Sequence, residues 1–139
     1  MTTVTALNHI NLRAPRALLG TLRDFYCAVV GLREGPRPAF GSHGFWLYAG
    51  DTAVVHLSEQ HAEETPRGPA RADAPVTFDH VAFTAVDPDA AAATLRAHGI
   101  AFRIDRNTVA RQHQFFFADP AGNGVELNFP FHDEDTGAC

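Results

Sequence analysis

Two stretches of the sequence share one pattern and place a group able to do chemistry at the same point. HGFWLYAGDTAVVHL covers residues 43–57 and HQFFFADPAGNGVEL covers residues 113–127. Each begins with His, continues through aromatic residues and ends on Val-x-Leu, where the middle residue is His56 in one and Glu126 in the other. Imidazole and carboxylate groups bind divalent cations and transfer protons, so these two positions predict a metal or acid–base site.

The two stretches belong to a longer internal repeat. LNHINL (7–12) resembles FDHVAF (78–83), which matches His9 with His80, and VGL (30–32) resembles HGI (98–100). The three pairs of segments are offset by 71, 68 and 70 residues, so the sequence predicts two copies of one module. We expect one domain made of module one (5–58), a linker (59–76) rich in Pro, Ala and charge, module two (77–130) and an acidic tail (131–139).

Each module is expected to fold as βαβββ. Apolar residues recur at helical spacing within 15–32 and Gly31 ends that helix, while Asp87, Pro88 and Gly99 are typical of the cap, start and end of a second helix. Alternating patterns predict the strands, at 7–12, 33–38, 45–48 and 53–57 in module one and at 78–83, 101–106, 114–118 and 124–129 in module two. The fold class is therefore α+β, with two tandem βαβββ modules.

The alternation also predicts which side chains share a face. Because successive residues of a strand point to opposite sides, the apolar neighbours of the candidate residues pack on the helices. Four side chains then point away from the helices, on the first and last strands of the modules: His9, His56, His80 and Glu126. A single such His is usually only solvated, but burying a carboxylate beside imidazoles needs compensation, and a divalent metal supplies it. We interpret the four residues as metal ligands.

Composition excludes several other classes of function. The formal net charge is −5 and no basic cluster is present, which argues against a nucleic-acid partner. No apolar run approaches the roughly 20 residues of a membrane span, and the first residues do not form a signal peptide. Cys27 and Cys139 do not make a disulfide framework, so we expect a reducing, cytoplasmic location.

The doubled module resembles the vicinal oxygen chelate superfamily, which includes glyoxalase I, extradiol dioxygenases, fosfomycin-resistance transferases and bleomycin-binding proteins. The resemblance rests on NHINL, DHVAF and above all DPAGNGVEL, and it runs from Leu7 to about Phe129. It implies a glyoxalase-like open barrel around one divalent metal per site (iron, nickel, zinc or manganese). The family's ligand positions, carried onto this chain, are again His9, His56, His80 and Glu126. A homodimer is implied by analogy, with each site built from one chain or two.

The resemblance leaves three functions open. A metal-dependent lyase or isomerase acting on a small metal-chelating molecule is slightly favoured, with Glu126 as the catalytic proton-transfer group. An extradiol-type dioxygenase would use His9, His80 and Glu126 on iron, but Phe116 stands where those enzymes carry Tyr. A bleomycin-resistance-like protein that sequesters a drug is the third, although such proteins generally lack the metal ligands.

The substrate pocket is predicted from the same faces. Asn11 lies on the ligand face of its strand, Trp46 and Phe116 occupy equivalent positions in the two modules, and Gln114 shares the face of Phe116. Together they predict a largely apolar pocket for a small organic substrate. Arg106 and Arg111 approach the same strand and are interpreted as surface residues rather than as an anion site.

Overall fold

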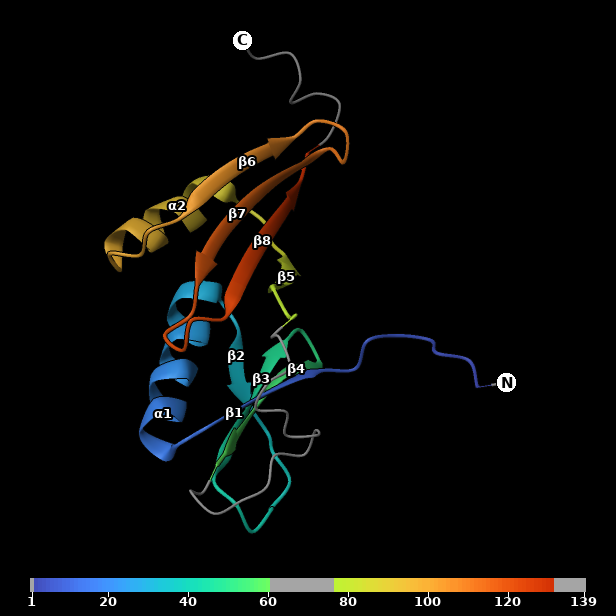
Figure 1. Cartoon of the computed structure of the whole chain (residues 1–139), viewed down its shortest axis with the longest axis vertical. Coiled ribbons are helices and arrows are strands. Elements are labelled where there is room, and N and C mark those ends of the chain that lie inside the picture. The colour runs from blue at the N-terminus through green and yellow to red at the C-terminus, as the bar shows by residue number, and fades with distance from the viewer. Residues whose placement is uncertain (1, 61–76, 132–139) are drawn as a thin grey trace. The chain divides into compact units, whose positions relative to one another are not determined.

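The computed structural model describes residues 2–60 and 77–131. Most of the predicted linker (61–76) and of the predicted acidic tail (132–139) lies outside these residues. The chain divides into two compact units, Met1–Ala74 and Pro75–Cys139. Each unit holds one four-stranded mixed sheet with a helix along one side (Figure 1).

The first unit has the predicted βαβββ order. Its elements are β1 (Ile10–Ala14), α1 (Arg16–Phe25) continued by a π-helical turn (Tyr26–Val30), β2 (Arg33–Gly35), β3 (Gly44–Ala49) and β4 (Thr52–Glu59). The helical segment ends at Gly31, whose φ of 93° is the left-handed conformation expected of a C-terminal glycine. The strand order is β1-β4-β3-β2, with β1 parallel to β4 and the other pairs antiparallel.

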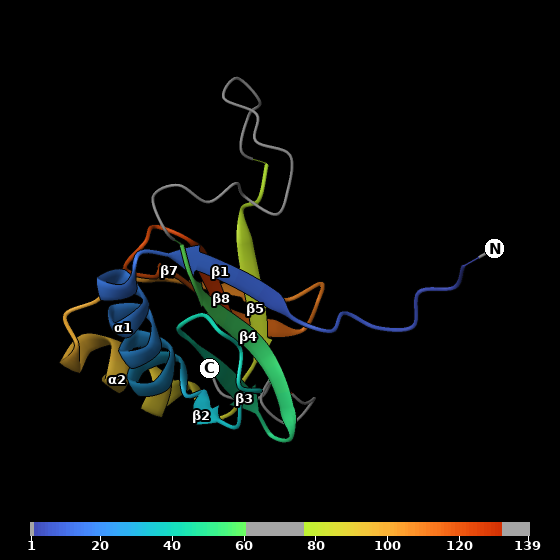
Figure 2. The ribbon, with the colours of Figure 1, turned by 90° about the horizontal axis from the view of Figure 1, so that it is seen from below.

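The second unit repeats this topology. It contains β5 (His80–Thr84), α2 (Pro88–Ala97), β6 (Arg103–Asn107), β7 (Gln112–Ala118) and β8 (Gly124–Pro130), in the order β5-β8-β7-β6. Here too the first strand runs parallel to the last, and Figure 2 shows β1 beside β4 and β5 beside β8. The two units share one order of elements and one order of strands, which confirms the prediction of two βαβββ modules. Both sheets are open.

The first strand of each module is shorter than the sequence pattern predicted. Pairing with the last strand starts at Ile10 in the first unit and at His80 in the second. Leu7 is 81% exposed and Phe78 is 55% exposed, because neither residue has a strand beside it in this pairing. His9 therefore lies immediately before β1, and His80 is the first residue of β5.

The two cores lie between the helices and the predicted apolar faces of the sheets. In the first unit Leu19, Leu22 and Tyr26 of the helix and Val55 and Leu57 of β4 are almost fully buried. In the second unit Leu95 of α2 and the β8 residues that flank Glu126, Val125 and Leu127, are buried in the same way. The helices thus cover one face of each sheet and leave the candidate ligands on the other.

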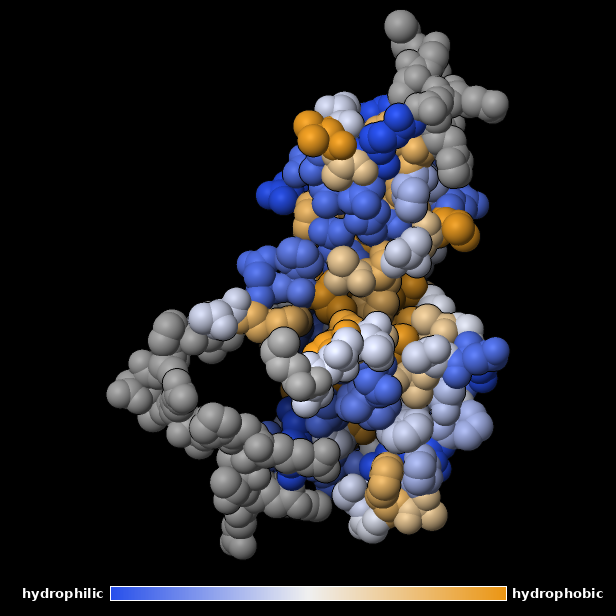
Figure 3. Space-filling view, turned by 90° about the vertical axis from the view of Figure 1, so that its right-hand side faces the viewer, coloured by the Kyte–Doolittle hydropathy of each residue, from blue (hydrophilic) through white to orange (hydrophobic). Residues whose placement is uncertain are grey.

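The surface of the described residues is mixed in hydropathy. On the face drawn in Figure 3, hydrophilic side chains cover much of each unit and hydrophobic ones form smaller groups. In residues 2–60 and 77–131 neither helix has the length and apolar character needed to cross a bilayer.

Asp87 is expected to contribute measurably to the stability of the second unit. Its carboxylate accepts a hydrogen bond from the Ala90 amide at 3.0 Å, and its φ of 60° is a conformation that Asp and Asn tolerate better than Ala. Asp87→Ala should lower the free energy of unfolding by about 1 kcal/mol in urea denaturation, and Asp87→Asn should lose much less. Equal losses in the two variants would contradict a capping role.

Candidate metal centre

The register of each sheet places the candidate residues in one row across the face away from the helix. In the first unit Asn11 and Trp46 both lie directly opposite His56. In the second unit Ala82 and Phe116 lie in the same way opposite Glu126. Because directly opposed residues point to the same face, His56 and Glu126 are equivalent positions of two equivalent rows.

The second unit brings two candidate ligands together. His80 Nε2 lies 3.5 Å from Glu126 Oε1, and Glu126 is 4% exposed. Two ligand atoms bound to one cation at about 2.1 Å are roughly 3.0–3.4 Å apart, so this spacing is close to that of a shared metal. Asn128 donates a hydrogen bond to the other oxygen of Glu126 at 3.1 Å, which holds the carboxylate in place.

The residue that precedes His9 and the residue that precedes His80 each contact Nδ1 of the following ring. His80 Nδ1 lies 2.7 Å from the Asp79 carboxylate, and His9 Nδ1 lies 2.7 Å from the side-chain oxygen of Asn8. Both oxygens accept hydrogen bonds, so these contacts favour the tautomer with its proton on Nδ1, which leaves Nε2 for a ligand. A carboxylate on the remote nitrogen is the usual partner of a metal-binding histidine.

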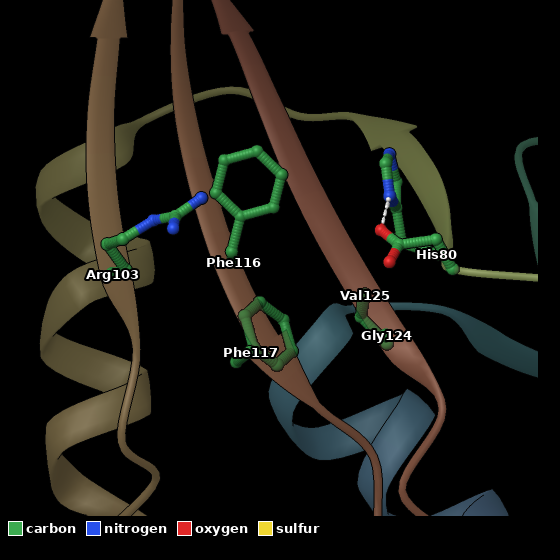
Figure 4. A pocket seen from close by; sticks show the side chains of 7 residues that line it. His80, Arg103, Phe116, Phe117, Gly124 and Val125 are labelled. Carbon is green, nitrogen blue, oxygen red and sulfur yellow. Dashed lines mark hydrogen bonds and ion pairs between the residues drawn. The ribbon is translucent and has the colours of Figure 1, made fainter.

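Figure 4 shows the surroundings of His80. His80 stands on β5 with one ring nitrogen in a marked hydrogen bond, and the ring of Phe116 lies between His80 and Arg103. The His80 and Phe116 rings meet edge to face at 5.9 Å, and the Arg103 guanidinium lies 4.8 Å from the centre of the Phe116 ring. These residues line a cavity of about 420 Å³.

Asp79 is expected to strengthen metal binding without supporting the fold. Its side chain is 91% exposed, so Asp79→Ala should leave stability nearly unchanged. Loss of the Nδ1 partner should weaken metal binding by about 10- to 100-fold, measured by competition with a chromophoric chelator. Asp79→Asn keeps an acceptor at this position and should remain within a few-fold of wild type. An unchanged affinity in Asp79→Ala would show that this contact does not orient a ligand.

The first unit holds its two candidate ligands in a different arrangement. The His9 and His56 rings are stacked with centres 3.8 Å apart and planes 13° apart, and Trp46 stacks on the other side of His56 at 4.2 Å. An imidazole binds a metal in its own ring plane, and two nearly parallel planes do not meet close to the rings. His9 and His56 therefore need a ring rotation before both can bind one cation.

The environment of His56 favours its neutral form. Burial lowers the pKa of His56, and the neighbouring His9 and Arg37 lower it further. The neutral imidazole is the form that binds metals. The donor chemistry of both units therefore fits a divalent cation, and His80 and Glu126 are the pair whose spacing is closest to that of two ligands of one metal.

A second cavity, of about 480 Å³, lies in the first unit. His9, His56, Trp46 and Asn11 line it together with Arg37 and the hydroxyl groups of Ser42 and Ser58. Asn11 accepts a hydrogen bond from Ser58 at 3.1 Å. Of the four predicted pocket residues, Asn11 and Trp46 line this cavity and Phe116 lines the cavity of the second unit, while Gln114 lines neither.

Sequence reasoning missed several residues that contact the candidate ligands. Asn8 and Asp79 directly precede the two histidines, and this shared position was a visible signal. Asn128, two residues after Glu126, follows from the same alternation of faces. The arginines that line the cavities are Arg37 and Arg103, whereas Arg106 and Arg111 lie over the ring of Phe131. Nothing in the sequence singled out Arg37.

The described residues contribute candidate ligands in pairs. Over residues 2–60 and 77–131 no group of three or more His, Cys, Asp or Glu side chains is assembled for one metal. One pair is His9 and His56 in the first unit, and the other is His80 and Glu126 in the second.

Comparison with known proteins identifies the fold and the family. The sequence model of the Glyoxalase/Bleomycin resistance protein/Dioxygenase superfamily matches residues 6–127. A glyoxalase family protein from Bacillus anthracis has 22% identity and a TM-score of 0.70, over 94% of this chain and 99% of that one. Lactoylglutathione lyase from Agrobacterium tumefaciens has 23% identity and a TM-score of 0.62, over 92% and 96%.

A third similar structure contains a metal. The fosfomycin resistance protein FosX from Listeria monocytogenes, in complex with Mn(II) and a dihydroxypropylphosphonic acid, has 14% identity and a TM-score of 0.65, over 98% of this chain and 100% of that one. A search of curated proteins gave no match. The family match covers most of the chain and agrees with the doubled βαβββ topology, so this protein belongs to the Glyoxalase/Bleomycin resistance protein/Dioxygenase superfamily.

Proposed function

We propose that this chain is a metal-dependent lyase or isomerase acting on a small organic molecule that chelates the metal through oxygen atoms. The observation that carries the proposal is the pair formed by His80 Nε2 and Glu126 Oε1, 3.5 Å apart at a buried carboxylate. With Nδ1 protonated, the Nε2 lone pair faces a carboxylate oxygen, and a divalent cation held by His80 and Glu126 would compensate both groups. The proposed ligands are His80 and Glu126 with His9, and His56 after rotation of its ring.

The residues around the pair have separate roles in this proposal. When bound, a divalent cation polarises the oxygens of the substrate and makes a neighbouring C–H group more acidic. Glu126 takes that proton and returns it to another atom of the substrate, while Asn128 keeps the carboxylate aimed. Asp79 keeps Nε2 of His80 free, and the Phe116 ring shields the site from water on one side.

The second candidate function is an extradiol-type dioxygenase. The stack of His9 on His56 favours it, because only one of two parallel rings can bind the cation without rotation. His9, His80 and Glu126 would then form the two-histidine, one-carboxylate set of non-haem iron oxygenases. We extend the proposal to a homodimer, in which one chain or two supply each site.

Metal content tests the proposal. Wild type and His56→Ala are purified, stripped with a chelator, reconstituted separately with iron, nickel, zinc and manganese, and analysed for bound metal. We expect about one metal per chain in wild type. Preference for nickel or zinc supports proton transfer, whereas iron retained fully by His56→Ala supports the dioxygenase. If no metal binds under any condition, the enzyme proposal fails and a sequestering protein explains the chain better.

A further inference from the structure

The cavity of the first unit contains a positive charge that no described acidic residue compensates. Arg37 lines this cavity beside His9 and His56, and it forms no ion pair among residues 2–60 and 77–131. Among the residues that the structure describes, no carboxylate lines the cavity. This is unexpected in a chain with a net charge of −5, because acidic residues outnumber basic ones by 16 to 11.

The described residues that hold the guanidinium of Arg37 in place are all neutral. One terminal nitrogen donates to the backbone oxygen of Ser42 at 3.0 Å, and the other donates to the Ser42 hydroxyl at 3.4 Å. The ring of Phe40 lies 4.8 Å below it, and a Cβ added to Gly44 would come within 2.9 Å of it. Arg37 is thus seated against the sheet by a serine, an aromatic ring and a glycine.

This seating leaves donors unused. Each terminal nitrogen carries two N–H groups, of which Ser42 takes one, and the buried Nε has no hydrogen-bond partner. A partly buried cation with unused donors and no counter-ion is costly unless a ligand supplies the negative charge. Guanidinium groups bind carboxylates and related oxyanions strongly through paired hydrogen bonds.

The cavity of the second unit provides an internal comparison. Arg103 also packs on an aromatic ring there, but it is 70% exposed and lies 3.8 Å from the Asp105 carboxylate. The Asp79 carboxylate lines the same cavity, so both signs of charge are present. Within the described parts of the chain, Arg37 differs from Arg103 in having neither a carboxylate partner nor a carboxylate in its cavity.

We propose that Arg37 binds an oxyanion of the substrate in the cavity of the first unit, so that the substrate is a small organic acid whose flat or apolar part lies against Trp46. This inference rests on the proposed function, because it names the class of substrate on which the proposed enzyme acts. It assigns recognition of the anionic group to one residue of the first unit.

The only tryptophan of the chain lines this cavity, which gives a direct readout of binding. Fluorescence of Trp46 is titrated in the full-length protein with phenylacetate, with phenylphosphonate and with the neutral isostere phenylacetamide. A chelator is present throughout, so no metal contributes. We expect saturable binding of at least one acid, about tenfold or more tighter than that of the amide. Comparison of the two acids distinguishes a carboxylate from a phosphonate site.

Three variants test whether Arg37 is the residue responsible for tighter binding of the acid than of the amide. Arg37→Gln should remove the tenfold preference for the acid, Arg37→Lys should retain part of it, and Arg103→Gln should leave it unchanged. Equal binding of acid and amide by wild type, or an unchanged preference in Arg37→Gln, would overturn the inference. Metal content of Arg37→Gln should equal that of wild type. An acid preference without metal binding would overturn the proposed function alone, whereas metal binding without the preference would overturn this inference alone.

Discussion

Glu126→Gln is expected to bind divalent metal at least about 100-fold more weakly than wild type while remaining folded. The substitution keeps the shape of the side chain but removes the charge that lies 3.5 Å from His80 Nε2. Loss of a residue that only hydrogen-bonds to a metal ligand already costs 10- to 100-fold in affinity, so loss of the ligand itself should cost no less. Isothermal titration of stripped protein with zinc or manganese measures the difference.

Glu126→Gln should be at least as stable as wild type without metal and less stable than wild type with metal. Glu126 is 4% exposed, and a neutral amide is less costly to bury than a carboxylate, so stripped Glu126→Gln should be at least as stable as stripped wild type. With metal at 100 times its dissociation constant, wild type should gain about 2.7 kcal/mol and the variant almost nothing. Metal-dependent stabilisation of the variant equal to that of wild type would rule out Glu126 as a ligand.

The architecture could be predicted because it depends on regular patterns. Alternation fixes which side chains share a face, and a repeat of about 70 residues reveals two modules even at low similarity. Gly31 and Asp87 end and cap their helices as predicted, since positive φ and side-chain capping are local properties. The first strand was predicted to start at Leu7 but starts at Ile10, because an alternating pattern does not reveal where the partner strand stops pairing.

The site was predicted less completely, because a shared face does not determine how a side chain is oriented. His56 lies on the expected face, yet its ring is stacked between His9 and Trp46, which come from two other segments of the first unit. Arg37 follows β2 in the sequence and reaches the cavity only because Phe40, Ser42 and Gly44 seat it there. Such contacts depend on tertiary packing, and no spacing in the sequence encodes them.

Gly124→Ala is expected to separate His80 from Glu126. His80 and Gly124 are paired across β5 and β8, and a Cβ at position 124 would lie 2.2 Å from the Asp79 carbonyl oxygen and 3.0 Å from the His80 Cβ. Backbone cannot yield as a flexible side chain does, so β5 must move away from β8. We expect a loss of about 1–3 kcal/mol in stability, from urea denaturation, and a loss of at least about tenfold in metal affinity.

Gly20→Ala is the matched control, because it adds the same methyl group where nothing lies within 4 Å. Position 20 is inside α1, where Ala is favoured over Gly, so stability should stay constant or rise by up to about 1 kcal/mol and metal affinity should not change. The two measurements on Gly124→Ala then separate the fold from the site. If stability falls while metal affinity holds, β5 is needed for packing but His80 does not bind the metal. If both fall together, Gly124 is what allows a histidine on one strand and a carboxylate on the next to meet at one cation.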